Sequence, residues 1–291
     1  MASERLIKRR IRSARNISQI TNAMQMVAAS KMRKAQSAAV SGRPYAEKIA
    51  QMTAAFVAKI NPDKHPLLKK NEQGKSLLVV ISTNKGLLGG LNANLFRKIQ
   101  SWYSKDLLDT AVFITVGKKG EQYLVNTKRQ LMADFSQNIP FTKSIPALTT
   151  FITEGYLKQE FSEVILIYNN FVTALTQEPA RKKILPISEF VYEAGNNASA
   201  ETAEKKLDFI IEPTIDEILE ALLFNYLENQ VRDAIYEAEA AEHSARMVAM
   251  KNATENAVEL INLLTLEYNQ ARQAKITFEI ADMVTARMAV E

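Results

Sequence analysis

Small and apolar side chains recur at intervals of three or four residues over the first part of the chain. This spacing is close to the helical period, so residues 3–41 are predicted to form one helix with a narrow apolar stripe. The stripe comprises Ile7, Ile11, Ala14, Ile17, Thr21, Met24, Ala28, Met32, Ala35 and Ala39. Gly42 and Pro44 are expected to bend or interrupt this helix before a second amphipathic stretch from Tyr45 to Ile60.

The end of the chain carries a similar pattern. Thr214-Ile215-Asp216-Glu217 has the form of a capping box and predicts the start of a helix after Pro213. Its apolar stripe contains Ile215, Leu219, Leu222, Tyr226, Val231, Ala234, Ala238, Ala241, Ala245, Val248, Ala257, Ile261 and Leu264. At about 1.5 Å per residue such a helix would span roughly 115 Å, more than one ordinary domain can cover. We therefore expect an antiparallel coiled coil with the N-terminal helix.

The two predicted helices differ in length. If both leave the same central domain, the C-terminal helix extends further by roughly 20 residues at helical rise. The excess contains the apolar residues Ile276, Phe278, Ile280, Met283 and Val284. An uncovered helix end of this kind is unfavourable in water, so we expect a partner that encloses it. A frayed tail is the alternative.

The middle of the chain alternates between short apolar runs and helical segments. Strands are predicted at residues 77–81, 111–116 and 163–168, with two more at 171–176 and 182–187 that could pair antiparallel. Helices are predicted near residues 91–103, 118–125 and 146–159. This order is typical of an α/β, Rossmann-like domain with a mixed, mostly parallel sheet. The expected domains are residues 1–61, 62–213 and 214–291.

Composition and charge support this division. All 9 Gly and 8 Pro lie between Gly42 and Pro213, so the strongest helix breakers are absent from both ends. Residues 1–50 carry 11 basic and 2 acidic residues, whereas residues 214–291 carry 6 basic and 14 acidic residues. Opposite charges make the two terminal helices natural partners for each other.

Several classes of chemistry are excluded. The chain has no Cys and only two His, which excludes thiol catalysis and disulfides and argues against a His-rich metal site. No apolar run reaches the roughly 18 residues that span a bilayer, and no secretory signal is recognisable. A cytoplasmic setting without cofactor or metal is expected.

The stretch from Gly86 to Asn92 invites a nucleotide-binding interpretation, because it follows a predicted strand and opens a predicted helix. It lacks the Lys-Ser/Thr pair of a P-loop and does not read G-x-G-x-x-G. A tight turn is therefore favoured over a phosphate site.

Four segments together resemble one family. Residues 7–36, 85–94, 245–257 and 268–277 closely resemble the gamma subunit of F-type ATP synthases, and the resemblance covers the whole chain in order. Ile276-Thr277-Phe278-Glu279 matches the family's usual C-terminal motif, whereas Arg287 and Met288 interrupt its small-residue tail. The absence of a transit peptide favours a bacterial protein.

The resemblance implies a central-stalk rotor that couples ion-driven rotation of the c-ring to conformational change at the beta-subunit catalytic sites. The chain would be present as one copy with the alpha, beta, delta and epsilon subunits and the c-ring, as a peripheral protein at the cytoplasmic face of the bacterial membrane. It would catalyse nothing and would bind neither nucleotide nor nucleic acid.

Residue roles follow from the same resemblance. Contacts with the alpha/beta ring are implied for Lys8, Arg9, Arg10, Met24, Lys31, Arg33, Lys34, Arg246, Arg272, Gln273, Thr277 and Glu279. The basic residues among them could instead balance the acidic C-terminal helix, and Met24 with Val27 would seat the coiled coil. Contacts with the c-ring and epsilon are implied for Asp208, Phe209, Ile210, Ile211 and Glu212.

Two other functions stay open from the residues alone. The alternation of strands and helices suits a small-molecule enzyme, and a basic N-terminal helix suits a nucleic-acid binder whose affinity falls with salt. Neither explains two long helices without a single breaker.

Overall fold

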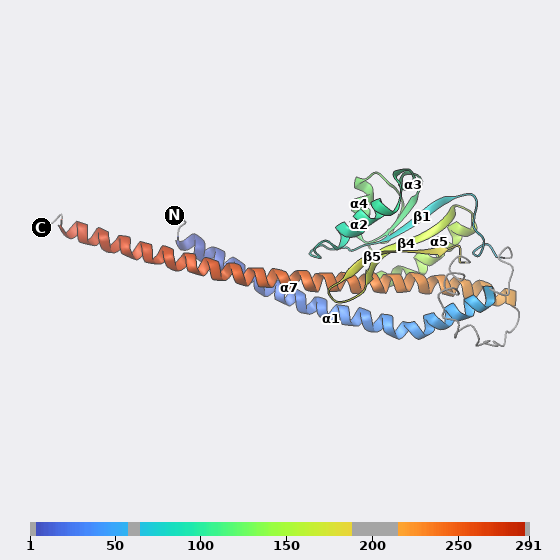
Figure 1. Cartoon of the computed structure of the whole chain (residues 1–291), viewed down its shortest axis with the longest axis horizontal. Helices are drawn as coiled ribbons and strands as arrows, with labels where there is room; N and C mark the ends of the chain where they lie inside the picture. The colour runs from blue at the N-terminus through green and yellow to red at the C-terminus, as the bar shows by residue number, and fades with distance from the viewer. Residues whose placement is uncertain (1–3, 58–64, 188–214, 289–291) are drawn as a thin grey trace. The chain divides into compact units, whose positions relative to one another are not determined.

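The computed structural model describes residues 4–57, 65–187 and 215–288 (Figure 1). Contacts between residues divide the chain into two units, with boundaries at Ser30/Lys31 and Ala245/Arg246. We call residues 4–30 and 246–288 the coiled-coil unit and the described residues from 31 to 245 the sheet unit. Helices α1 (Glu4–Val57) and α7 (Ile215–Met288) contribute to both. The predicted domain boundaries at residues 61 and 213 fall outside the described residues, so that division stays a prediction.

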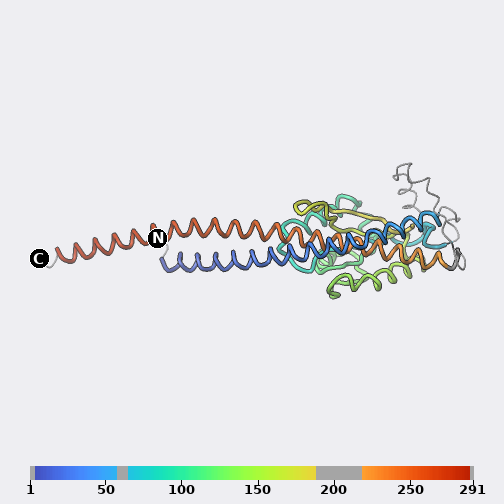
Figure 2. The backbone as a smooth tube through the Cα atoms, turned by 90° about the horizontal axis from the view of Figure 1, so that it is seen from below, coloured from blue at the N-terminus to red at the C-terminus, as the bar shows by residue number. Residues whose placement is uncertain are grey.

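In the coiled-coil unit the first part of α1 lies antiparallel to the last part of α7 (Figure 2). Ile7 and Ile11 are buried against Leu264, with Ile261 and Tyr268 packed around them. Further along α1, the hydroxyls of Thr21 and Thr254 are 2.7 Å apart. Later residues of α1 therefore contact earlier residues of α7, so the two helices run in opposite directions. This confirms the predicted antiparallel coiled coil.

The seam between these helices follows a seven-residue repeat. Residues 7, 11, 14, 18, 21, 25 and 28 of α1 are buried or half-buried, as expected when two helices wind around each other. Ile17 is 50% exposed and Val27 is 57% exposed. Their predicted places in the seam are wrong, because the 3.5-residue spacing of a coiled coil selects the neighbouring position at residue 18. Met24 is half-buried, as a flanking residue.

Helix α1 continues through Gly42 and Pro44, so of the two expected outcomes, a bend or an interruption, the structure shows the bend (Figure 1). A proline inside a helix removes one backbone hydrogen bond and crowds the preceding turn. The turns beyond it are held by tertiary packing, since Ile49, Phe56 and Val57 are buried in the core of the sheet unit. Figure 1 shows α1 curving in its light-blue part rather than breaking.

The sheet unit contains a five-stranded sheet in the order β3-β2-β1-β4-β5. Strands β1 (Lys75–Ile81), β2 (Val112–Val116), β3 (Gln130–Asp134) and β4 (Phe161–Phe171) pair in parallel. Strand β5 (Gln177–Leu185) runs antiparallel to β4. This is the predicted mixed, mostly parallel sheet.

Alternate residues of the central strands face two separate cores. On one face, Leu77 and Val79 of β1 pack with α1, α7, the short helix η2 (Phe141–Ser144) and α5 (Ile145–Leu157). On the other face, Leu78 and Val80 pack with α2 (Leu91–Trp102), α3 (Lys105–Thr110) and α4 (Lys118–Asn126). The strands read as continuous apolar runs because both faces are covered.

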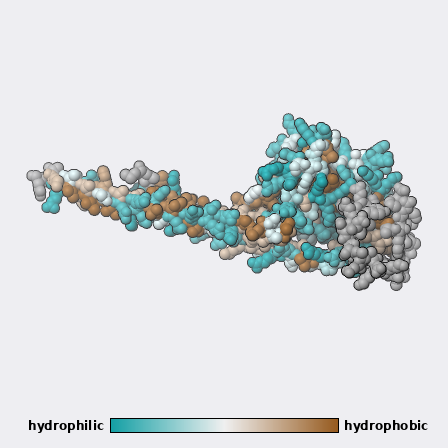
Figure 3. Space-filling view, viewed as in Figure 1, coloured by the Kyte–Doolittle hydropathy of each residue, from teal (hydrophilic) through white to brown (hydrophobic). Residues whose placement is uncertain are grey.

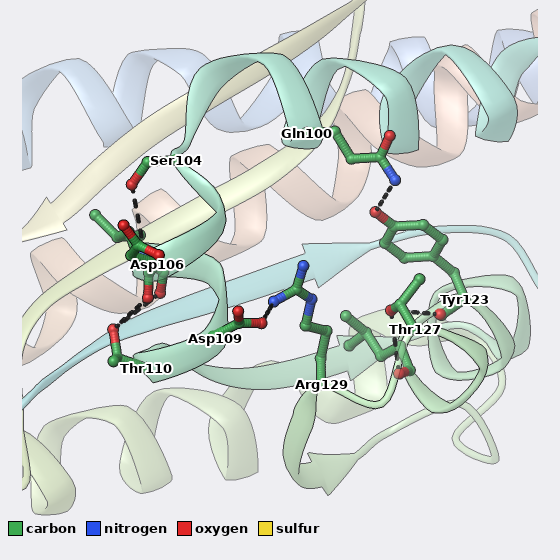
Figure 4. A network of polar contacts seen from close by, with 10 residues as sticks. Gln100, Ser104, Asp106, Asp109, Thr110, Tyr123, Thr127 and Arg129 are labelled. Atoms are coloured by element: carbon green, nitrogen blue, oxygen red, sulfur yellow. Dashed lines mark hydrogen bonds and ion pairs between the residues drawn. The ribbon is translucent and has the colours of Figure 1, made fainter.

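The helices on the α2 side are joined by polar contacts as well (Figure 4). The Gln100 amide of α2 donates to the Tyr123 hydroxyl of α4 at 3.2 Å. Ser104 caps α3 by accepting from the Leu107 N–H, and Arg129 pairs with Asp109 at the end of that helix. These contacts hold α3, which the sequence did not predict, against its neighbours.

Two local predictions differ from the structure. Residues 172–176 form the turn between β4 and β5 rather than a strand, because the Thr173 hydroxyl accepts the Leu175 and Thr176 N–H groups and closes the chain on itself. Strand β3 was not predicted, since its residues alternate at a sheet edge. No helix in the described part of the chain combines the length and apolarity that crossing a membrane requires.

Candidate partner-binding surfaces

The C-terminal end of α7 forms an uncovered apolar surface. Tyr268 donates to Glu4 at 3.1 Å, and Lys275 lies 3.7 Å from the same carboxyl group. Beyond them α7 continues to Met288, and every residue from 272 to 288 is exposed. Figure 3 shows hydrophobic side chains along this end.

The apolar residues of this end lie on more than one side of the helix. Ile276, Ile280 and Met283 are spaced by four and three residues and share a face, whereas Phe278, 67% exposed, points elsewhere. Large apolar side chains exposed on more than one side of a helix mark a surface that another protein covers. This geometry fits a partner that surrounds the helix end, as the sequence predicted.

The four polar residues predicted on this end are all exposed, and they lie on two faces of the helix. Arg272 and Glu279 are seven residues apart and share one face, and Gln273 and Thr277 share another. Glu279 lies 3.6 Å from Lys275, and the Thr277 hydroxyl donates to the Gln273 carbonyl at 3.0 Å. Arg246, by contrast, is half-buried far from this end.

A second apolar surface lies on the outside of the coiled-coil unit, and sequence reasoning missed it. On α1, Ile17, Ile20, Met26 and Val27 are at least half exposed; on α7, Leu260, Leu263 and Leu266 are about as exposed. The signal was present in the sequence, because these residues exceed what a two-helix seam needs. Large exposed apolar residues in this number make the outside of the coiled-coil unit a candidate surface for another protein.

The predicted basic residues of α1 are exposed. Lys8, Arg9 and Arg10 lie near its start, with Lys31, Arg33 and Lys34 further along. In the described chain, no salt bridge joins Lys8, Arg9 or Arg10 to an acidic residue. Burial raises the pKa of Glu239 on α7, and the positive charge of Lys31 opposes that rise. Lys31 therefore interacts with the acidic helix, whereas the first group remains available to an acidic partner.

The Gly-rich segment forms the favoured tight turn, with Leu87 and Gly89 at φ values of 63° and 59°. Its polar neighbours are bonded internally: the Asn92 amide donates to the Thr83 hydroxyl at 2.8 Å, and Thr83 donates to the Lys85 carbonyl at 2.9 Å. The Asn84 carboxamide oxygen accepts from the Lys118 N–H at 2.9 Å. The turn therefore ties β1, α2 and α4 together.

A small cavity separates this turn from α7. It is lined by Ser82, Thr83, Leu91, Asn169, Glu239 and Glu242, among others. Asn169 is buried, and its Oδ1 has no hydrogen-bond partner in the described chain. Burial, followed by the nearby Glu242 carboxylate, raises the pKa of Glu239, while the Phe141 N–H and Lys31 oppose the shift.

Glu239→Gln is expected to stabilise the sheet unit at neutral pH. A carboxyl group whose pKa is raised by folding takes up a proton on folding, so its contribution to stability is lost as pH rises from about 4.5 through the raised value. The variant keeps the oxygen that accepts from Phe141 but cannot ionise. Urea unfolding, followed by fluorescence of the single Trp102, should show a higher midpoint than wild type at about pH 7.5 and a smaller difference at about pH 4. The exposed Glu259→Gln is the control, and an equal shift in both variants would contradict the assignment.

The remaining predicted contact residues, Asp208, Phe209, Ile210, Ile211 and Glu212, lie outside the described residues. Among the residues that are described, no three His, Asp or Glu side chains gather in a way that could hold a metal ion.

Comparison with known proteins identifies the family. A sequence model of a family described as ATP synthase matches residues 3–290. The chain is 42% identical over 297 residues to a protein named ATP synthase gamma chain from Methylacidiphilum infernorum (isolate V4), with 100% of both chains covered. The chain belongs to the ATP synthase gamma-chain family. A second gamma chain, from Opitutus terrae, is 40% identical, with 99% of each chain covered.

Solved structures agree with this family on the fold. A chain in the Euglena gracilis mitochondrial ATP synthase structure of OSCP, F1 and c-ring superimposes with a TM-score of 0.69 at 21% identity, covering 99% of this chain and 94% of that one. A chain in the rotor of the same enzyme superimposes with a TM-score of 0.63 at 20% identity, covering 94% of this chain and 98% of that one. The architecture of long paired helices and a mixed sheet is therefore that of the family.

Proposed function

We propose that the chain is the central-stalk rotor of an F-type, proton-translocating ATP synthase. The observation that carries this proposal is the full-length similarity to gamma chains, 42% identical in the first relative. The exposed apolar end of α7 supports it, because a rotor needs a helix that a surrounding ring can hold. In this function the chain is a non-catalytic subunit of an enzyme complex.

Rotation by the c-ring would be passed along α7 and α1 to the catalytic subunits. A rotor can drive three sites through different affinities only if it contacts each differently at a given angle. The end of α7 provides this asymmetry, since its sides differ: Ile276 and Ile280 share one face with Arg272, whereas Phe278 lies on the opposite side. Turning the helix presents these faces in sequence.

We assign the partners by surface. The alpha and beta subunits would enclose the end of α7 and the outer apolar surface of the coiled-coil unit, with Lys8, Arg9 and Arg10 facing acidic groups. The c-ring and the epsilon subunit would bind the sheet unit, and residues 208–212 remain the proposed contact. Delta would belong to the same complex, which would hold one copy of this chain at the cytoplasmic face of the bacterial membrane.

The two alternatives are not favoured. Full-length relatives named gamma chains argue against a separate small-molecule enzyme or nucleic-acid binder. The polar groups around the Gly-rich turn bond to one another, which gives that turn a structural role.

Arg272→Ala combined with Gln273→Ala is expected to weaken attachment of the chain to the alpha/beta ring. Both side chains are exposed and would lose polar contacts that form only in the complex, each worth about 1 kcal/mol. The variant and wild type should be co-expressed with alpha and beta subunits, and assembly and ATP synthesis compared. Glu259→Ala, an exposed change on α7 closer to the sheet unit, is the control. Unchanged assembly and synthesis would remove this assignment, and a wild-type chain that never associates with an ATPase would remove the proposed function.

A further inference from the structure

Helix α7 makes an unusual polar contact at the last residues that it contributes to the sheet unit. The buried Ser244 hydroxyl donates to the Ala174 carbonyl at 2.6 Å and accepts from the Gln177 amide at 3.2 Å. Ala174 lies in the turn between β4 and β5, and Gln177 is the first residue of β5, about 70 residues earlier in the chain. The contact therefore joins the helix to the sheet directly.

Other hydroxyls on α7 behave differently. Thr254, Thr265, Thr277 and Thr285 each donate to a carbonyl one turn earlier in their own helix. That local bond is the usual choice for a hydroxyl inside a helix. Ser244 instead donates to another element, so its position is set by tertiary structure.

The segment that receives Ser244 is itself closed by hydrogen bonds. Thr173 and Thr176 exchange backbone hydrogen bonds, at 3.0 and 3.3 Å. Gln177 also donates to the carbonyls of Thr173 and Ala174. A turn held in this way presents the Ala174 carbonyl in a fixed direction.

A second turn contacts the next residue of α7. Ala245 is buried with Leu88 and Leu91, which belong to the Gly-rich turn and the start of α2. Successive residues of α7 thus contact turns that follow β4 and β1, two neighbouring strands of the sheet. The boundary between the units falls directly after Ala245.

Apolar packing alone holds a helix weakly against turning about its axis. Between Leu219 and Ile235 the residues of α7 in the core of the sheet unit are apolar, and their contacts have little direction. Directional contacts follow after this stretch, where Glu237 accepts from the Tyr168 hydroxyl and Glu239 from the Phe141 N–H, and Ser244 is the last of these. A hydrogen bond is directional, and a shift by one residue turns a helix by about 100° and breaks the bond.

We propose that Ser244 is a positioning residue that locks the rotation angle of α7 relative to the sheet unit and so keeps the rotor from slipping under load. This inference rests on the rotor function proposed above. Ser244, Gln177 and Ala174 form the lock, and Leu88, Leu91 and Ala245 support it.

The test uses the complete ATP synthase reconstituted in vesicles with the full-length chain. Ser244→Ala removes the hydroxyl at nearly constant volume, and Gln177→Leu removes its partner. We expect hydrogen exchange of the 172–176 amides to accelerate roughly 5- to 30-fold in both, the factor that corresponds to one or two lost hydrogen bonds. The steady proton gradient reached during ATP hydrolysis should fall, while assembly and the hydrolysis rate at zero gradient stay at the wild-type level.

Matched variants make the outcome decisive. Thr265→Val deletes a hydroxyl that bonds only its own helix and should leave the gradient unchanged. Ser244→Thr keeps the hydroxyl and should keep the wild-type gradient. The double variant of Ser244 and Gln177 should lose less than the sum of the two single variants, because the two side chains share one hydrogen bond. A normal gradient in the Ser244→Ala and Gln177→Leu enzymes, with wild type pumping, would overturn the lock. If Ser244→Ala does not assemble, Gln177→Leu decides alone. A wild-type chain that supports no pumping would instead count against the rotor function.

Discussion

Gly117→Ala is expected to lower the free energy of unfolding of the sheet unit by more than about 3 kcal/mol. Gly117 has a φ of 109°, a conformation that residues with a side chain rarely adopt. A Cβ built there would lie 2.4 Å from the Ser82 carbonyl oxygen and 2.7 Å from its carbon. Neither group can yield cheaply, because both belong to the backbone at the end of β1, where Ser82 N–H also donates to Val116.

The measurement is urea unfolding of the full-length chain, followed by Trp102 fluorescence. Trp102 ends α2, and the Arg181 guanidinium lies 5.6 Å from its ring centroid, so its emission reports on the sheet unit. Gly42→Ala is the matched control: nothing lies within 4 Å of its added Cβ, and Gly42 is inside α1. That variant should gain roughly 0.5–1 kcal/mol from helix propensity. Similar midpoints for both variants would contradict this account of the close approach.

Ile11→Asp is expected to separate the helices of the coiled-coil unit. Ile11 is 9% exposed and packs with Ile7 and Leu264, so the carboxylate would be buried without a partner. We expect a loss of about 3–5 kcal/mol from the pairing of the two helices, the usual cost of an unpaired buried charge. Circular dichroism should show helix lost at a lower temperature than in wild type.

Ile17→Asp separates folding from assembly in the same experiment. Ile17 is exposed in the chain alone, so the helix content and its melting temperature should change little. In the complex, the same substitution would place a charge on the outer apolar surface and should reduce association with the alpha and beta subunits. A variant that melts early like Ile11→Asp, or that assembles normally, would show that this surface is not a binding surface.

The parts of the fold that follow from local pattern were predictable. Strands β1, β2 and β4 are covered on both faces, so they appear as unbroken apolar runs in the sequence. Strand β3 was missed because it lies at the sheet edge with alternating exposure, and α3 because six residues are too few to show a helical period. The sequence left open whether Gly42 and Pro44 bend or interrupt α1, and the buried apolar residues that follow them keep the helix continuous.

The exposed part of the candidate site could be predicted from the sequence. The parts that depend on which segments contact each other in the fold could not. The apolar end of α7 could be anticipated, since Glu4 pairs with residues 268 and 275 and the first helix begins there. The register of the seam could not be anticipated. Ile17 is more apolar than Ser18, and only the winding of the two helices around each other places residue 18 rather than residue 17 in the seam. The contact of Ser244 with Ala174 joins segments far apart in sequence and leaves no local pattern.

One feature of the core bears on how the protein is made. The face of the sheet that carries Leu77 and Val79 is covered by Ile49, Phe56 and Val57 from α1 and by Leu219 to Ile235 from α7. During translation α1 is synthesised before the strands, whereas α7 leaves the exit tunnel only after all five strands. The core of the sheet therefore cannot be completed during most of translation, and the apolar residues of α1 stay exposed until α7 is available. Folding of the whole chain is thus expected to be largely post-translational, with the last quarter of the sequence closing a core that its first quarter began.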